Sequence, residues 1–366
     1  MTSEAPGRSR KPRRQDSRSP DLHRAALTIR DVAAMARVSQ GTVSKVLNEA
    51  PGVGAETRRR VLKLIRDLDF QPNASARSLV ARKTGSIGVI IPHTGSYSMS
   101  SAYWPILLTS ITETAAARSL NVLLSTARSE EDVDSAYRTI LRGRRVDGLI
   151  VGAEQFGQQQ LVELLFKGFP FVMVGKSPFV THWHVDVDNA GGTRSMTQHL
   201  VKLGHRHIAM LAGPVHYPAV QERIEGFRTA IRAAGLEPRV CHCNYHTETA
   251  TTCIRDLLAV RPRVTALFVA AGDLTTAALA ATRELGVSVP SDLALAAFDD
   301  HPYYEYLEPP ITAVSQPIPE LGRAALDMLF TLMDGREPEA TGRVLPTRLV
   351  IRRSCSFQGL IGLTPG

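Results

Sequence analysis

In residues 38–48, VSQGTVSKVLN, apolar residues recur at helical spacing with polar residues between them. Gln40, Gly41, Ser44 and Lys45 share the polar face of the helix that this spacing predicts. Gln and Lys side chains can hydrogen-bond base edges in the major groove of DNA, and Ser and Thr hydroxyls can hold phosphates. This face therefore favours recognition of a nucleic acid.

Short helices at 29–36, 40–47 and 55–68 would position that face, since apolar residues recur there at helical spacing. Thr28, with Asp31 three residues later, predicts an N-terminal cap for the first helix, and Ser39 predicts one for the second. A tight turn at 37–38 makes the first two a helix-turn-helix. The expected inward side chains are Val43, Val46, Leu47, Val61, Leu62, Ile65 and Leu68. Periodicity leaves open a three-helix bundle with no role in DNA binding.

The basic residues are concentrated near the N-terminus. The net charge is +8, and residues 1–85 hold 18 Lys and Arg against 8 Asp and Glu, while the rest of the chain holds 25 against 27. A basic module on a near-neutral body indicates a polyanionic partner. Residues 1–26 have the composition of a disordered arm, for which a solubilising tail is the plainer interpretation.

Residues 70–84, FQPNASARSLVARKT, predict a helix over 74–80 capped by Asn73. A helix of about two turns is marginal by itself in water. One interpretation is a flexible linker. The other is a hinge that folds only on DNA, with basic residues such as Arg77 around it and Leu79 as an apolar wedge in the minor groove.

From residue 86 onward, apolar runs alternate with amphipathic stretches. Buried strands are predicted at 87–91, 121–125, 148–151, 171–174, 208–211, 264–269 and 293–298, and a further strand at 240–243. Helices are predicted at 104–119, 131–142, 191–203, 222–234, 250–260 and 273–285. This alternation predicts a doubly wound α/β fold, present twice.

Other chemistries have weaker support. The sequence contains no G-x-S-x-G, H-E-x-x-H, P-loop or G-x-G-x-x-G motif, which argues against an enzyme. Cys241, His242, Cys243 and His246 resemble a metal cluster, but strand alternation puts His242 opposite the cysteines. Four cysteines without an even framework fit a reducing cytoplasm, and no apolar run suits a membrane span or a secretory signal. We predict a cytoplasmic protein without metal or cofactor.

The ordered motifs resemble the lactose-repressor (LacI/GalR) family of bacterial transcription regulators. They include TIRDVA (28–33), V-S-x-x-T-V-S-x-V-L-N (38–48), N-A-x-A-R-S-L (73–79), RVDGLIV (145–151), ERIEGF (222–227) and ITAVSQP (311–317). The resemblance covers nearly all of residues 27–353. After the arm 1–26 it implies a helix-turn-helix DNA-binding headpiece at 27–72, a hinge helix and linker at 73–85, a two-lobed effector-binding and dimerisation domain at 86–353, and a tail at 354–366.

The lobes are expected to be of the periplasmic-binding-protein type. The resemblance implies a first lobe at about 86–188 and 316–337 and a second lobe at about 189–315 and 338–353. A helix at 319–333 should pack on the first lobe, and residues 343–351 should return to the second. The chain would therefore cross between lobes near 188, 315 and 338.

The resemblance also assigns roles in DNA binding. Gln40, Gly41 and Lys45 match the positions that vary with operator sequence. The phosphate-contacting, capping and intercalating set, with the hinge residues, is Thr28, Ser39, Thr42, Ser44, Asn48, Asn73, Arg77 and Leu79. Because Gly41 has no side chain, Gln40 and Lys45 must carry more of the direct readout. A good bidentate base contact contributes about 1–3 kcal/mol of discrimination.

A ligand between two such lobes would lie at the carboxyl ends of the strands. The resemblance places Tyr103, Trp104, Arg223, Tyr245 and Asp299 there. Arg and Asp can grip vicinal hydroxyls, and aromatic faces can cover a sugar ring, so a sugar-like effector is favoured. The alternatives are an ion pair between Arg223 and Asp299, and core positions for Trp104 and Tyr245.

Gly272 stands where the family often has Asn, which removes one possible sugar contact. The resulting hypothesis is a repressor that binds a palindromic double-stranded DNA operator as a homodimer under control of a small sugar-like effector. The tail has no apolar heptad, which favours a dimer over a coiled-coil tetramer. The alternatives are a body that senses a non-sugar metabolite or a partner protein, and a periplasmic sugar-binding protein, which would need a signal peptide.

Overall fold

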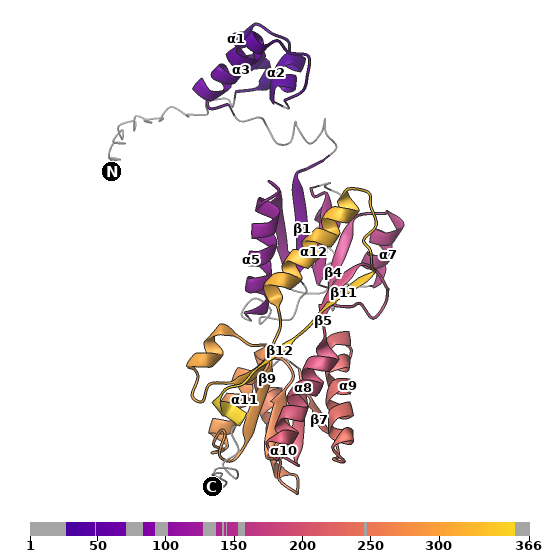
Figure 1. The fold of residues 1–366 in the computed structure, drawn as a ribbon, viewed down its shortest axis with the longest axis vertical. Helices are drawn as coiled ribbons and strands as arrows, with labels where there is room; N and C mark the ends of the chain where they lie inside the picture. Colours follow the sequence, from indigo (N-terminus) through magenta and orange to yellow (C-terminus); the bar gives the residue numbers. More distant parts are fainter. Residues whose placement is uncertain are drawn as a thin grey trace, which may run out of the picture. The chain divides into compact units, whose positions relative to one another are not determined.

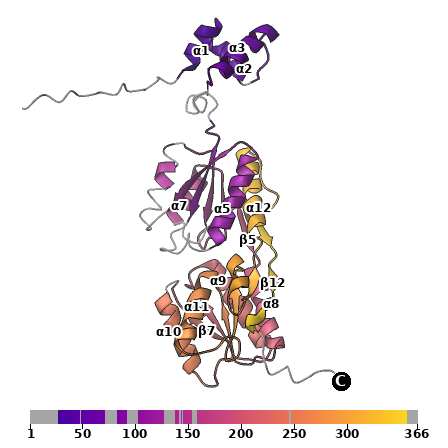
Figure 2. The same cartoon turned by 90° about the vertical axis from the view of Figure 1, so that its left-hand side faces the viewer.

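The structure is a computed structural model that describes residues 27–47, 49–70, 83–91, 102–126, 137–140, 143, 145–152, 158–244 and 247–355. The chain divides into two compact units, Met1–Val80 and Ala81–Gly366 (Figures 1 and 2). We call the described part of the first unit the headpiece and the second unit the body. The predictions that lie outside the described residues concern 1–26, Asn48, Asn73, the helix at 74–80 with Arg77 and Leu79, most of the helix at 131–142, Tyr245, His246 and most of the tail.

The headpiece contains α1 (Ile29–Ala36), α2 (Gln40–Leu47) and α3 (Ala55–Asp67), which confirms the predicted helices. Thr28 caps α1 in a capping box, since its side chain accepts the Asp31 N–H while the Asp31 carboxylate accepts the Thr28 N–H at 2.9 Å. The hydrogen bond from the Thr28 side chain lowers the pKa of Asp31. Arg37, at φ 53°, ends α1 in the left-handed conformation.

A small apolar core holds these helices together. It consists of Val32, Ala33, Ala36, Val43, Val46, Val61 and Phe70, with Leu64, Ile65 and Leu68 packed against it. The predicted inward position of Leu62 is wrong, because this side chain is 40% exposed. The inward stripe of α3 runs through positions 61, 64, 65 and 68, and Leu62 falls beside it.

The first lobe of the body is built on a parallel sheet with the strand order β11-β5-β4-β3-β1-β2. The strands are β1 (Ser86–Ile91), β2 (Asn121–Thr126), β3 (Gly148–Gly152), β4 (Phe171–Val174), β5 (His184–Val187) and β11 (Gly342–Leu345). Helices α5 (Tyr103–Ala116) and α12 (Ile318–Met333) cover one face and α7 (Gln158–Phe166) covers the other (Figure 2). Both faces of the central strands are therefore buried.

The second lobe repeats this plan with the strand order β12-β10-β9-β8-β6-β7. Its strands are β6 (Ile208–Ala212), β7 (Arg239–His242), β8 (Ala266–Val269), β9 (Ala294–Phe298), β10 (Thr312–Ser315) and the antiparallel β12 (Arg348–Val350). Helices α8 (Asn189–Lys202) and α9 (Pro218–Ala233) lie on one face, and α10 (Thr247–Ala259) and α11 (Gly272–Glu284) lie on the other. The predicted doubly wound α/β fold, present twice, is confirmed.

The chain passes between the sheets after Val187, again after Ser315, and last at 346–347. The predicted return to the second lobe near 338 is wrong for residues 342–345. These residues form β11, which pairs in parallel with β5 from Gly342↔His184 to Leu345↔Val187. The pairing satisfies backbone groups that β5 would otherwise leave open at the sheet edge.

Two cysteines depart from the expected reduced state. Cys241 and Cys253 form a disulfide, so the expectation that the cysteines are all reduced is wrong for this pair. Their separation of 12 residues gave no signal, because one lies on a strand and the other on a helix. Within the described residues, no helix has the length and apolar character needed to cross a membrane.

Close packing of α8 against α9 gives a direct test of the fold. A Cβ at Gly226 would lie 2.2 Å from the carbonyl oxygen of Ala190, which is backbone and cannot move aside cheaply. We expect Gly226→Ala to lower the free energy of unfolding of the body by about 1–3 kcal/mol, as overpacking typically does. Chemical denaturation followed by tryptophan fluorescence measures it.

Thr229→Ala, on an exposed position of the same helix, is the matched control, with an expected change within about 0.5 kcal/mol. Equal unfolding midpoints for the two variants would contradict the close approach of the helices.

Candidate DNA interface and effector cleft

Helix α2 presents the predicted base-reading positions outward. Gln40, Gly41 and Lys45 are exposed, whereas Val43 and Val46 are buried against the other helices. A Cβ at Gly41 would meet only the Ser39 hydroxyl, at an ordinary 3.7 Å, so packing within the headpiece does not require glycine there. The outward face thus presents the Gln40 amide and the Lys45 ammonium group, with no side chain at Gly41.

The N-terminal end of α2 carries hydroxyl groups. Ser39 Oγ accepts the Thr42 N–H at 3.1 Å and lies 2.9 Å from Thr42 Oγ1, which confirms Ser39 as the cap. The positive end of the helix dipole and these hydroxyls suit a phosphate group. Ser44 is half-buried on the same helix. The Thr28 hydroxyl belongs to the capping box of α1, and its contact with DNA remains a prediction.

In the body, Arg223 on α9 is held in one orientation. Its Nε donates to Asn189 Oδ1 at 2.9 Å and its Nη1 donates to the Ala270 carbonyl at 2.7 Å. The guanidinium carbon lies 3.7 Å from the centre of the Phe298 ring. An arginine fixed in this way needs little reordering to grip a polar ligand.

Asp299 follows β9 and lies at the carboxyl edge of the second sheet. Its φ of 74° is in the left-handed region, and such strain is common at ligand sites. Its carboxylate accepts the Gly272 N–H at 3.0 Å and a hydrogen bond from the side-chain amide of Gln316. Among the described residues, Arg223 and Asp299 take different partners, so the alternative of an ion pair between them is wrong.

The other residues predicted for the effector site differ in how far they are buried. Trp104 is 9% exposed and packs in the core of the first lobe, as the alternative interpretation held, while its neighbour Tyr103 is half-buried. Gly272 has a structural reason, because a Cβ there would lie 2.1 Å from Nε2 of the buried His301 ring. The imidazole occupies space into which an Asn side chain would project. The part of Tyr103 and Trp104 in effector binding remains a prediction.

Sequence reasoning missed a polar network that joins the lobes. Lys176, which follows β4 of the first lobe, forms an ion pair with Glu222 on α9 of the second lobe. Asn189 Nδ2 lies 3.4 Å from Glu222 Oε2 and 3.2 Å from Asp186 Oδ1. Lys176 Nζ also lies 3.9 Å from the second oxygen of Asp186. The network reaches Arg223 through Asn189, so it connects the lobe contact to the predicted effector residue.

At both Asp186 and Lys176, burial and the nearby charges of opposite sign shift the pKa in opposite directions. Burial raises the pKa of Asp186, and the Val187 N–H and the nearby cations only partly offset this effect. Burial lowers the pKa of Lys176, but the hydrogen bond and charge of Glu222 outweigh it and leave the pKa raised. Lys176 therefore stays charged at neutral pH, and its attraction to Glu222 favours the observed approach of the lobes.

A double-mutant cycle tests this lobe contact. Lys176→Met and Glu222→Gln should each lower the free energy of unfolding, with a coupling of about 0.5–1 kcal/mol for a partly exposed pair. Added salt should reduce the coupling. The exposed pair of Glu163 on α7 and Lys167 just after it is the control, with an expected coupling of about 0.3 kcal/mol. Additive losses for Lys176 and Glu222 would show that the pair does not hold the lobes.

Asp147, outside this network, is a further residue that sequence reasoning missed. Its carboxylate accepts the backbone N–H groups of Thr84 at 2.6 Å and Gly85 at 2.8 Å. This carboxylate fixes the chain just before β1, where the segment from the headpiece joins the first lobe. The RVDGLIV motif contains this Asp, but its spacing gave no reason to pair it with residues some 60 positions away.

Comparisons with known proteins find matches for both the headpiece and the body. Residues 28–73 match the family described as "Bacterial regulatory proteins, lacI family", and residues 197–355 match a "Periplasmic binding protein-like domain". The HTH-type transcriptional regulator CelR of Thermobifida fusca is 33% identical over 89% of this chain and 98% of its own. The ribose operon repressor of Halalkalibacterium halodurans is 29% identical over 89% of this chain and 96% of its own.

Solved structures give the same result. A CelR–cellobiose complex is 31% identical with a TM-score of 0.68, and the comparison covers 90% of this chain and 99% of that one. The lac repressor dimer bound to operator and the anti-inducer ONPF is 26% identical with a TM-score of 0.79, over 90% of this chain and 99% of that one. The likeness thus includes the headpiece as well as the body.

Proposed function

The chain belongs to the LacI family of bacterial regulatory proteins, and from this premise we propose that it represses transcription by binding an operator as a homodimer. It is a DNA-binding transcriptional regulator. The observation that carries the proposal is the outward face of α2, where exposed Gln40 and Lys45 stand above a buried apolar stripe. Side chains of this kind read base edges in the major groove.

Two headpieces related by two-fold symmetry would place their α2 helices in successive major grooves, about 34 Å apart. The operator would therefore be an inverted repeat. Asn48, Asn73, Arg77 and Leu79 would complete the contact, with Leu79 wedged into the central minor groove. This regulator would act in the cytoplasm without a cofactor.

We propose a small sugar as the effector, bound between the lobes beside Arg223, Asp299 and Gln316. The fixed guanidinium of Arg223 and the carboxylate of Asp299 suit paired hydrogen bonds with vicinal hydroxyls. The relative CelR was solved with cellobiose, which makes this disaccharide the first candidate. Tyr103 and Tyr245 would contribute aromatic surface, as a sugar ring favours.

The effector would act through the distance between the lobes. Lys176 and Glu222 join the lobes, and Asp147 holds the segment that leads to the headpiece. A ligand that binds one lobe arrangement better than another shifts the balance between them, with a coupling of typically about 1–3 kcal/mol. The change would reach the DNA through residues 71–85.

Thermal-shift screening of the full chain against cellobiose, maltose, ribose and glucose tests the sugar effector. We expect one of them to raise the melting temperature and to change operator affinity about 5-fold to 100-fold. If no sugar has either effect while operator binding is intact, the effector is a different metabolite or a partner protein.

A further inference from the structure

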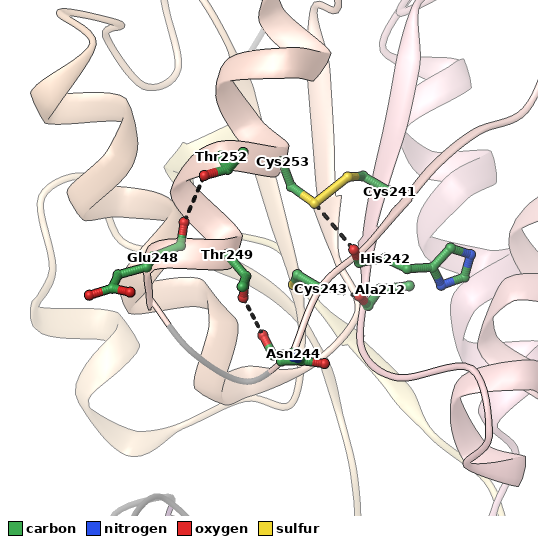
Figure 3. Close-up of a disulfide and its surroundings, with 9 residues drawn as sticks. All are labelled: Ala212, Cys241, His242, Cys243, Asn244, Glu248, Thr249, Thr252 and Cys253. Atoms are coloured by element: carbon green, nitrogen blue, oxygen red, sulfur yellow. Dashed lines mark hydrogen bonds between the residues drawn. A yellow bond between two sulfur atoms is a disulfide. The ribbon is translucent and has the colours of Figure 1, made fainter.

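The Cys241–Cys253 disulfide joins a strand and a helix of the second lobe (Figure 3). Cys241 lies on β7, an edge strand that pairs with β6, and Cys253 lies near the middle of α10. Their Cα atoms are 6.0 Å apart, a normal distance for a disulfide. The link closes a ring around residues 242–252, which contain the β7–α10 loop and the start of α10.

The surroundings also accommodate the reduced pair. Cys253 Sγ lies 3.3 Å from the carbonyl oxygen of His242, which can accept a hydrogen bond once this sulfur is a thiol (Figure 3). Cys241 is half-buried on the edge strand, so a small reagent can reach it. A thiol at Cys253 would therefore have a hydrogen-bond acceptor within reach.

The other two cysteines do not compete for this link. Cys243 and Cys355 are buried and not in a disulfide. Burial raises the pKa of each thiol to about 11, so at neutral pH the reactive thiolate form is scarce. Exchange with a reagent is accordingly directed first to the half-buried Cys241, and the buried Cys253 reacts second, from within the protein.

The disulfide-linked strand ends at the same sheet edge as the candidate effector residues. Strands β6, β7, β8 and β9 are parallel, so the loop after β7 is at the same sheet edge as Ala270 after β8 and Asp299 after β9. Ala270 holds Arg223, and Asp299 holds Gln316. The hydrogen bond from Thr249 Oγ1 to the Asn244 carbonyl, at 3.1 Å, also closes this loop. The disulfide thus ties α10 to a strand whose carboxyl end lies at the sheet edge that the effector would use.

We propose that Cys241 and Cys253 are a reversible redox site that controls how firmly the first turns of α10 are held against β7. A small-molecule disulfide RSSR is the oxidant. One cysteine thiolate attacks RSSR, forms a mixed disulfide and releases RS⁻; the second then displaces the other RS⁻ and forms the intramolecular bond. The two thiol protons pass to the two RS⁻ groups, so the protein is oxidised by two electrons and RSSR is reduced to two RSH. Excess thiol reverses the sequence.

Hydrogen exchange of the full chain in defined mixtures of reduced and oxidised glutathione tests the proposal. Mass spectrometry should find the 241–253 linkage in oxidised glutathione and its loss in reduced glutathione. Peptides covering 242–252 should exchange about 10-fold more slowly when linked, and the melting temperature should rise by about 3 °C or more. Peptides from α12 should not respond.

The variant Cys241→Ser/Cys253→Ser is the control, and its exchange should be the same in both mixtures. A stable glutathione adduct in place of the linkage, or no linkage at any glutathione ratio, would overturn the proposal. So would a linkage that forms but leaves exchange at 242–252 unchanged. Since none of these readouts needs an effector or DNA, they stand apart from the tests of the proposed function.

Discussion

Lys45→Ala is expected to weaken binding to the operator by about 10-fold to 100-fold, the loss of one base contact of about 1–3 kcal/mol. Lys45 is exposed in the last turn of α2, on the same outward face as Gln40. Because Gly41 has no side chain, it cannot take over the contact that Lys45 loses. Binding to random DNA should fall only about 2-fold to 3-fold, because the variant loses one positive charge that can interact with DNA phosphates.

Fluorescence anisotropy with an operator duplex and a scrambled duplex, at one ionic strength, measures both losses. Lys63→Ala is the matched control, because Lys63 is an exposed lysine on α3 and not on the predicted reading face. It should weaken the two duplexes equally. If Lys45→Ala also weakens them equally, Lys45 touches phosphate and does not read bases.

Arg223→Ala is expected to weaken effector binding about 100-fold or more while operator affinity without effector stays the same. A charge-assisted hydrogen bond contributes about 1.5–3 kcal/mol, and Arg223 can offer its ligand more than one. Arg223→Lys keeps the charge but loses the planar fork, so it should recover only part of the affinity. Isothermal titration with the sugar that stabilises the wild type measures the change.

Removing Arg223 also leaves Asn189 and the Ala270 carbonyl without their donor, so folding must be checked by the unfolding midpoint. Arg228→Ala is the control, because Arg228 is an exposed arginine on the same helix. A well-folded Arg223→Ala protein that still responds fully to the effector would show that the effector binds elsewhere.

The headpiece follows from sequence because its signals are local. Each helix is one amphipathic stripe with a capping residue in front, and both Thr28 and Ser39 form the predicted caps. Leu62 shows the limit of such reasoning. Leu62, Leu64 and Ile65 are all apolar, and only packing against α1 and α2 decides which of them face inward.

The buried strands of the body also follow from sequence, since a parallel sheet covered on both faces leaves continuous apolar runs. The short strand β11 does not follow. Its sequence GRVL has exposed and half-buried side chains, and its place beside β5 depends on backbone pairing rather than on hydrophobicity.

The candidate effector residues divide in the same way. Arg223 and Asp299 could be named in advance from the resemblance. The contacts of Lys176 with Glu222 and of Gln316 with Asp299 could not, although Glu222 and Gln316 lie in quoted motifs, because these contacts join positions 46 and 17 residues apart. The disulfide between Cys241 and Cys253 was hidden for a similar reason, as no periodic pattern relates an edge strand to the helix behind it.

The measurement that tests the central claim most directly is selection of duplexes from a random library by the full-length protein, at moderate ionic strength, followed by sequencing. The account predicts enrichment of one inverted repeat, with half-sites about one helical turn apart, bound by two copies of the chain. It also predicts that Gln40→Ala relaxes the same position in both half-sites. Enrichment of no sequence, or of a sequence without two-fold symmetry, would contradict it.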